Sequence, residues 1–133
     1  MKTNFDTRYK TNPQLENAGV WFAFPDCGAE FLVKRFGGAN APDVKKKMAK
    51  YYKPYAKQIE MNLFPEDKAK DIMIRIFVES CILDWKGIEI NGEQKEFDVE
   101  TCIELFKHLP ELCDQLTELA TDSVSYREEL GNS

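Results

Sequence analysis

The chain first shows a clear pattern at residues 20–35, where apolar strand-forming residues flank a cluster of turn residues. Val20–Phe24 and Glu30–Arg35 are the two candidate strands, and Pro25-Asp26-Cys27-Gly28 supplies a four-residue loop between them. A two-stranded hairpin is only marginally stable in water, so we expect one face of it to pack against helices.

The next apolar residues recur three and four positions apart, the period of an amphipathic helix. We expect this helix to start at Asn40–Asp43 and to run to Ile59, with an interruption at Pro54. A second helix is expected to begin at Pro65 and to end near Gly87. Apolar residues occur on most sides of the second helix, so we expect it to be the buried central helix of the fold.

The last third of the chain predicts one ambiguous segment and two helices. Residues 88–97 contain an Asn-Gly tight-turn dipeptide and form either a small hairpin or an ordered loop. Asp98 is a candidate N-cap for a helix over residues 99–108. A final helix is expected to start at Pro110 and to fray after Tyr126.

These elements predict a mainly helical α+β fold, in which the N-terminal antiparallel β-hairpin packs on four or five α-helices. Residues 1–18 have no periodic apolar pattern and are expected to form a flexible arm or a loosely docked extension. Residues 19–128 are expected to form a single globular domain, followed by a tail over residues 129–133. A chain of 133 residues with 43% hydrophobic residues can bury a core without a disulfide or a metal.

Charge is distributed unevenly along the chain. Residues 1–60 hold 11 Lys and Arg against 6 Asp and Glu, whereas residues 61–133 hold 7 against 17. The two charged surfaces either steer head-to-tail self-association or docking on a basic partner, or are solvated helix faces paired within the fold. The net charge of −5 argues against a general nucleic-acid binder, for which a basic domain is expected.

Patterns that mark common catalytic or cofactor sites are absent from the sequence, including the glycine-rich phosphate loops and the nucleophile elbow. Cys102 and His108 are six residues apart and lie on different sides of their predicted helix, so they cannot pair as nucleophile and base there. The four cysteines are widely spaced and are expected to be buried or semi-buried apolar residues. We therefore expect no enzymatic activity, no cofactor and no metal.

Two groups of charged residues are compatible with either a functional site or an ordinary solvated surface. Glu79 and Asp84 flank the central helix, and Glu100 and Glu104 share a helix face. These pairs can act in acid–base chemistry or bind a divalent ion, but solvated helix faces explain them more simply.

Residues 45–57 interleave lysines with tyrosines, a pattern that fits a nucleic-acid site, a basic surface for an acidic protein, or a core helix with a solvated lysine face. The helical spacing favours the core helix. The candidate partner-binding residues, taken from both charged halves, are Lys45, Lys46, Lys50, Lys53, Lys57, Glu100, Glu104 and Glu111.

The chain contains neither an apolar run long enough for a membrane helix nor the apolar segment of a signal peptide, so we expect it in the cytoplasm and away from membranes.

An ordered series of short motifs resembles the tail assembly chaperones of tailed bacteriophages. The matching features run from about Gly19 to Tyr126 and exclude the arm. They are Gly19-Val20-Trp21-Phe22 before an acidic turn, Tyr52-Lys53-Pro54-Tyr55, Leu83-Asp84-Trp85-Lys86-Gly87, Leu109-Pro110-Glu111-Leu112 and Ala120-Thr121-Asp122.

The resemblance implies a non-enzymatic role in viral assembly. Members of this family bind the long, helical tape measure protein, keep it soluble and promote assembly of the tail tube around it. They act in the cytoplasm of the bacterial host and are absent from the mature virion. The tape measure protein and the tail tube protein are therefore the partners that the resemblance implies, and the uneven charge adds further copies of the chain. The alternatives are another small phage protein, either a head–tail connector subunit or an inhibitor of a host factor.

Overall fold

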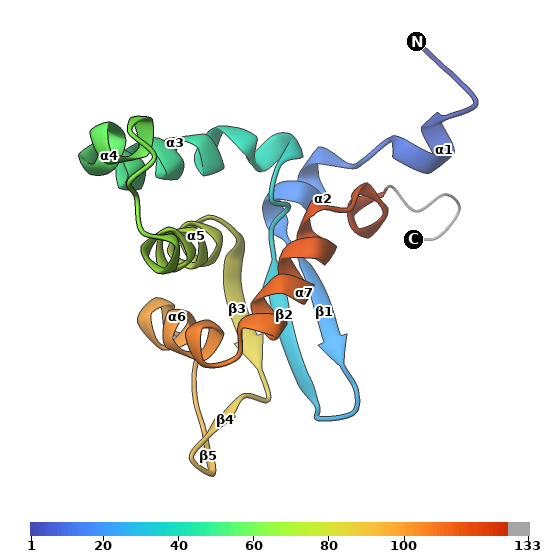
Figure 1. Ribbon diagram of the computed structural model, residues 1–133. Helices are drawn as coiled ribbons and strands as arrows, with labels where there is room; N and C mark the ends of the chain where they lie inside the picture. Colours follow the sequence, from blue (N-terminus) through green and yellow to red (C-terminus); the bar gives the residue numbers. More distant parts are fainter. Residues whose placement is uncertain (128–133) are drawn as a thin grey trace.

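A computed structural model describes residues 1–127 and shows a three-stranded antiparallel sheet packed against helices (Figure 1). The strand order is β1 (Val20–Phe24), β2 (Ala29–Val33) and β3 (Ile82–Lys86). The predicted mainly helical α+β class is confirmed. The sheet buries one face against helices α5, α6 and α7, whose inward side chains form the core with β2.

The N-terminal hairpin forms as predicted, with residues 25–28 as its loop. Val20 pairs with Val33 and Phe24 pairs with Ala29. Alternate residues of β2 are buried, because successive side chains of a strand point to opposite faces of the sheet. The second strand ends at Val33 rather than at the predicted Arg35.

Helix α5 (Glu66–Cys81) ends earlier than predicted, and residues 82–86 form β3 instead of its last turn. The predicted helix end near Gly87 is therefore wrong. Pairing β3 with β2 covers an edge that would otherwise expose unpaired backbone groups, and it buries Trp85. Gly87 is required just after the strand, because its φ is +68° and a side chain there would collide with the carbonyl oxygen of Gly28.

The lysine-rich segment forms η1 (Gly38–Asn40), α3 (Ala41–Tyr52), η2 (Lys53–Tyr55) and α4 (Ala56–Glu60). The predicted interruption at Pro54 is confirmed. Asn40 precedes the helix as expected, but its side chain does not cap it. The buried amide donates instead to the carbonyl oxygens of Arg35, at 2.9 Å, and Ser80, at 3.0 Å, which joins η1 to the end of α5.

The segment 88–97 forms a hairpin of β4 (Glu89–Ile90) and β5 (Glu93–Gln94), which settles the ambiguity of the sequence. Helix α6 (Val99–His108) has the predicted bounds, and the Asp98 side chain accepts a hydrogen bond of 2.9 Å from the amide of Thr101. The cap is therefore the one that the sequence indicates.

Helix α7 (Pro110–Thr121) ends before the predicted Tyr126 and is followed by η3 (Ser123–Tyr126). The side chain of Asp122 accepts a hydrogen bond from the amide of Val124 and starts the new turn. Tyr126 is fully buried, and its hydroxyl donates to the carbonyl oxygen of Val33 at 2.9 Å. The C-terminal turn is therefore anchored on the sheet.

The expected arm over residues 1–18 is only partly correct, because it contains α1 (Asp6–Tyr9) and a docked helix, α2 (Pro13–Ala18). Glu16 is 2% exposed, forms an ion pair of 2.5 Å with Arg35 and accepts a hydrogen bond from the amide of Ala39. These contacts place α2 in the globular body, whereas α1 projects from it (Figure 1). The predicted tail over residues 129–133 lies outside the described residues.

Candidate functional site

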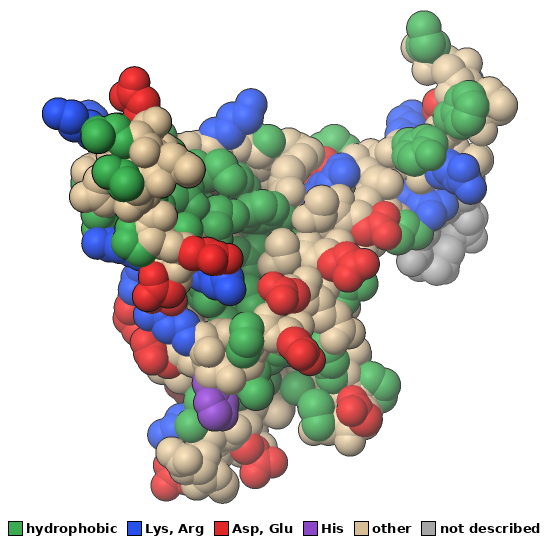
Figure 2. Space-filling view, in the orientation of Figure 1, with side chains coloured by type: hydrophobic (Ala, Val, Ile, Leu, Met, Phe, Trp, Pro, Cys, Tyr) green, Lys and Arg blue, Asp and Glu red, His purple; other side chains and the backbone are tan. Residues whose placement is uncertain are grey.

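An open apolar groove of about 450 Å³ lies between α5 and α7. Hydrophobic side chains gather in the hollowed face shown in Figure 2, between α3, α5 and α7. Six of its ten lining residues are apolar, and three are charged. Its lining residues are Glu66, Ala69, Lys70, Met73, Ile74 and Phe77 of α5, and Pro110, Cys113, Asp114 and Thr117 of α7.

The α7 side of the groove is acidic. Asp114 lines the groove, and Glu111 and Glu118 are exposed three and four residues away, so the three carboxylates follow one side of the helix. Acidic side chains are visible along α7 in Figure 2. On the α5 side, Glu66 and Lys70 have opposite charges. The surroundings of the groove are therefore apolar in the middle and negative along α7.

The groove follows from the unusual width of the apolar surface on α5. Ala69, Met73 and Phe77 are four residues apart and therefore lie along one side of the helix. Phe77 is 2% exposed and belongs to the core, but the other two are only partly buried. The sequence predicted a helix buried on most sides, which is correct for its second half and wrong for its first. The four-residue spacing of these side chains could have identified the stripe from the sequence. It could not have identified the groove beside the stripe, which also depends on α7.

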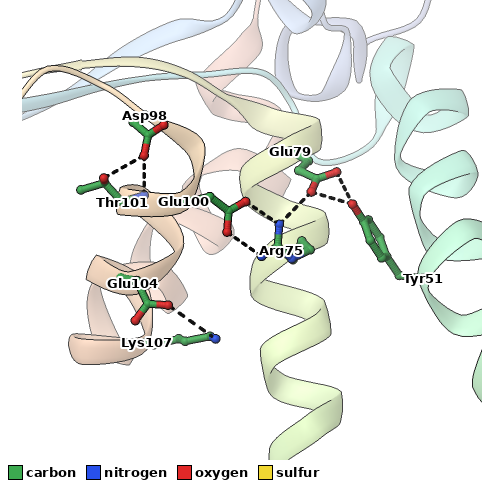
Figure 3. Close-up of polar contacts among 8 residues, drawn as sticks. All are labelled: Tyr51, Arg75, Glu79, Asp98, Glu100, Thr101, Glu104 and Lys107. Atoms are coloured by element: carbon green, nitrogen blue, oxygen red, sulfur yellow. Dashed lines mark hydrogen bonds and ion pairs between the residues drawn. The ribbon is translucent and has the colours of Figure 1, made fainter.

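A polar network on the neighbouring side of α5 ties three helices together (Figure 3). Arg75 donates two hydrogen bonds of 2.8 Å to Glu100 of α6 and one of 3.2 Å to Glu79 within α5. The Tyr51 hydroxyl of α3 donates to Glu79 at 2.6 Å. The hydrogen bonds from Arg75 lower the pKa of Glu100, and burial followed by the contact with Glu79 raises the pKa of Tyr51. The network joins α3, α5 and α6 through side-chain hydrogen bonds, which favours a structural role.

Removing the Tyr51 hydroxyl tests this role. We expect Tyr51→Phe to lower the free energy of unfolding by about 1 kcal/mol, because a partly buried carboxylate loses a charge-assisted donor. Urea unfolding measures the change. Tyr52→Phe is the matched control, since the hydroxyl of Tyr52 forms no side-chain hydrogen bond within residues 1–127. Equal stabilities for Tyr51→Phe and the unmodified chain would show that the hydrogen bond from Tyr51 to Glu79 contributes nothing.

The structure does not gather the predicted partner-binding residues into one site. The lysines occupy exposed positions along α3, η2 and α4, the glutamates 100 and 104 lie on α6, and glutamate 111 lies at the start of α7. Glu100 is engaged by Arg75, and Glu104 lies 3.8 Å from Lys107. Of the eight candidates, only Glu111 adjoins the α5–α7 groove. The full set is Lys45, Lys46, Lys50, Lys53, Lys57, Glu100, Glu104 and Glu111.

The tyrosine-rich helix contributes less to the core than expected. In α3 only Val44 is buried, whereas Tyr51 and Tyr52 are half-buried and their rings lie beside the polar network and Phe64. Ile59, predicted on the apolar face, is 42% exposed. The helix therefore packs on α5 through one narrow side, and Lys45, Lys46 and Lys50 are exposed to solvent.

The three buried cysteines are poor nucleophiles in this fold. Cys81, Cys102 and Cys113 are buried as predicted, and burial raises the pKa of Cys81 to about 12 and that of Cys113 to about 11. Cys27 is exposed in the hairpin loop, so the expectation of burial is wrong there.

Within residues 1–127, His, Cys, Asp and Glu side chains form no group of three or more that could hold a metal ion. Over the same residues, no helix has the length and apolarity that crossing a membrane requires.

Sequence comparison assigns a family to this fold. The family model of the YdaY prophage protein matches residues 39–131, well over half of the chain. The chain belongs to the YdaY prophage protein family. The YdaY match includes both helices that form the groove and leaves out residues 1–38, which hold the arm and the β1–β2 hairpin. No curated protein and no solved structure matches the chain significantly. Membership of the YdaY family establishes a phage-related protein.

Proposed function

We propose that this YdaY family protein is a tail assembly chaperone that binds the tape measure protein through the α5–α7 groove. The groove is the observation that carries the proposal, because an open apolar channel beside a row of carboxylates fits one face of an amphipathic helix. The phage-related family and the resemblance of short motifs to tail assembly chaperones support the same role.

The dimensions of the groove favour a helix as the ligand. From Glu66 to Phe77 the α5 side extends about 16 Å at 1.5 Å per residue, which accommodates roughly three turns of a bound helix. Apolar residues at three- and four-residue spacing would fill the centre. The acidic side chains of α7 favour a ligand helix with lysine or arginine along the facing flank, since complementary charge speeds encounter and fixes orientation.

The chaperone role requires exposed apolar surface on the partner. A tape measure protein presents amphipathic helical surface before the tube closes around it, and such surface aggregates when it is uncovered. Covering it through the groove keeps it soluble without any covalent step, cofactor or metal. On this proposal the chain acts in the cytoplasm of the bacterial host, delivers its partner to the tail tube protein and is absent from the mature virion.

Blocking the groove tests the proposal. Ala69→Arg places a long charged side chain on the partly buried floor of the groove. We expect this variant to lose about tenfold or more in affinity for the tape measure protein, about 1.4 kcal/mol of binding free energy, and therefore to lower the yield of soluble tape measure protein on co-expression. Ala56→Arg, at an exposed position of α4, is the matched control and should retain the full yield. Equal yields from both variants, with both folded, would exclude the groove as the binding surface.

A head–tail connector subunit is the competing role that is simplest to separate. A connector remains in the particle, whereas a chaperone leaves it. Mass spectrometry of purified virions therefore distinguishes the two, and we expect no peptides of this chain in particles that contain the tape measure protein. Stoichiometric recovery of the chain from virions would support the connector.

A further inference from the structure

We propose that the N-terminal arm, residues 1–10, docks in the α5–α7 groove of a second copy of the chain. Copies then associate head to tail, and each arm occupies the site that the tape measure helix would take. The competition with the tape measure helix rests on the proposed function, whereas the self-association does not.

The arm presents apolar side chains that the body of the same copy does not cover. Phe5 and Tyr9 are each 59% exposed, and their ring centroids are 6.4 Å apart on one side of α1. Figure 1 shows α1 projecting from the body, and α1 has no buried residue. Two adjacent exposed aromatic rings on a projecting helix are a typical anchor for a pocket on another molecule.

The base of the arm is fixed, so the arm is held in a defined direction. Asn12 donates its backbone amide to the carbonyl oxygen of Tyr126 at 2.9 Å, and Thr11 pairs with Arg127 in an isolated β-bridge. Glu16 then locks α2 onto the body through Arg35. These contacts hold the arm beside η3, which follows the C-terminal end of α7. The groove begins at the other end of α7, at Pro110. The two aromatic rings of the arm remain exposed to solvent.

Charge favours the groove as the receptor. Lys2, Arg8 and Lys10 make the arm basic, with Asp6 as its single acid. The α7 side of the groove has Asp114 within it and further carboxylates beside it. The aromatic pair matches the apolar centre of the groove, and the basic residues match its acidic margin. Both apolar burial and charge steering therefore favour the same pairing.

The arm and the groove are different surfaces of the molecule, so the interface is heterologous. Each copy that docks its arm still presents an empty groove, and each copy that receives an arm still presents its own. Such contacts build open chains when the rotation between copies does not close a ring. Association through this interface should also weaken as salt screens the charges.

Complementation between two defective variants tests the proposal. The arm variant carries Phe5→Asp and Tyr9→Asp, and the groove variant carries Ala69→Arg. We expect the unmodified chain to form oligomers that grow with concentration in sedimentation velocity, and each variant alone to sediment as a monomer. An equimolar mixture should form a one-to-one dimer, because one intact groove then meets one intact arm.

The controls separate this interface from other modes of association. Met61→Asp changes an exposed apolar residue after α4 and should associate as the unmodified chain does. Thermal unfolding of each variant verifies that it is folded. A monomeric unmodified chain, a monomeric mixture, persistent association of either variant, or dissociation caused by Met61→Asp would each overturn the proposal.

The two proposals can fail separately. The arm variant should still raise the solubility of the tape measure protein, since its groove is intact and unoccupied. The groove variant should not raise that solubility, and on its own it should sediment as a monomer. If complementation succeeds and co-expression has no effect, only the proposed chaperone function is wrong. If co-expression succeeds and complementation fails, only the docking of the arm is wrong.

Discussion

Replacing Phe106 with alanine is expected to lower the free energy of unfolding by about 4 kcal/mol. Phe106 is fully buried on α6, and its ring centroid lies 5.9 Å from that of Phe31 on β2 and 6.3 Å from that of Phe77 on α5. Truncation removes contacts to the sheet and to the central helix at once and leaves a cavity where they meet. Urea unfolding at neutral pH measures the loss.

Phe5→Ala is the matched control for this prediction. It removes the same ring from the exposed arm and should change stability by less than about 0.5 kcal/mol in the monomeric protein. Losses of similar size at the two positions would contradict the packing described for α6. A large loss at Phe106 together with an unchanged Phe5 variant would place the core where α5, α6 and β2 meet.

Glu16→Gln is expected to destabilise the protein by about 3 kcal/mol at neutral pH, because it breaks a buried ion pair. The Glu16 side chain is 3% exposed and that of Arg35 is 20% exposed. Burial works against ionisation of Glu16, but the hydrogen bonds from Arg35 and Ala39 outweigh it and hold the pKa below its ordinary 4.5. This loss of stability is at the low end of the range for a buried ion pair, because the Arg35 side chain is partly exposed to water.

The pH dependence of this effect has a definite sign. A pKa that is lower in the folded state than in the unfolded state stabilises the fold above the unfolded value. The contribution of Glu16 is therefore fully present above about pH 4.5 and is lost as the pH falls through the lower folded value. The stability difference between the unmodified chain and Glu16→Gln should shrink over that range. Glu60→Gln, at an exposed position, should show no such trend, and a constant difference at Glu16 would contradict the ion pair.

Local signals in the sequence predicted most of the elements. The β1–β2 loop, the break at Pro54 and the cap at Asp98 each depend on residues close together in the chain, and all three are confirmed. The sequence failed where a distant partner decides the structure. Residues 82–86 continue an apolar helical pattern, but pairing with β2, about fifty residues earlier, turns them into a strand.

The N-terminal segment shows the same limitation. Glu16 appears in a polar, aperiodic stretch, and nothing nearby reveals that Arg35 and the amide of Ala39 bind it. Local pattern therefore predicted an arm over the whole segment, although α2 is docked through contacts about twenty residues away. Helix α1, by contrast, has no buried residue.

The candidate site was the least predictable part of the molecule. Charge patterning identified exposed lysines and glutamates that lie on several helices, with only Glu100 and Glu104 lining one shared pocket. The groove depends instead on how α5 and α7 approach one another. Met73 and Thr117 belong to different predicted helices, and no spacing along the chain shows that they line one surface. Of the predicted residues, Glu111 adjoins the groove because its helix forms the acidic side.

We propose that a tape measure helix binds in the α5–α7 groove, and methionine methyl NMR measures this binding directly. The chain has four methionines, of which Met73 lines the groove and Met61 is exposed beyond α4. A methyl-labelled chain is titrated with a soluble helical segment of the tape measure protein from the same prophage. We expect the Met73 signal to shift and saturate while the Met61 signal stays in place. Saturable binding that leaves the Met73 signal unchanged would contradict this proposal.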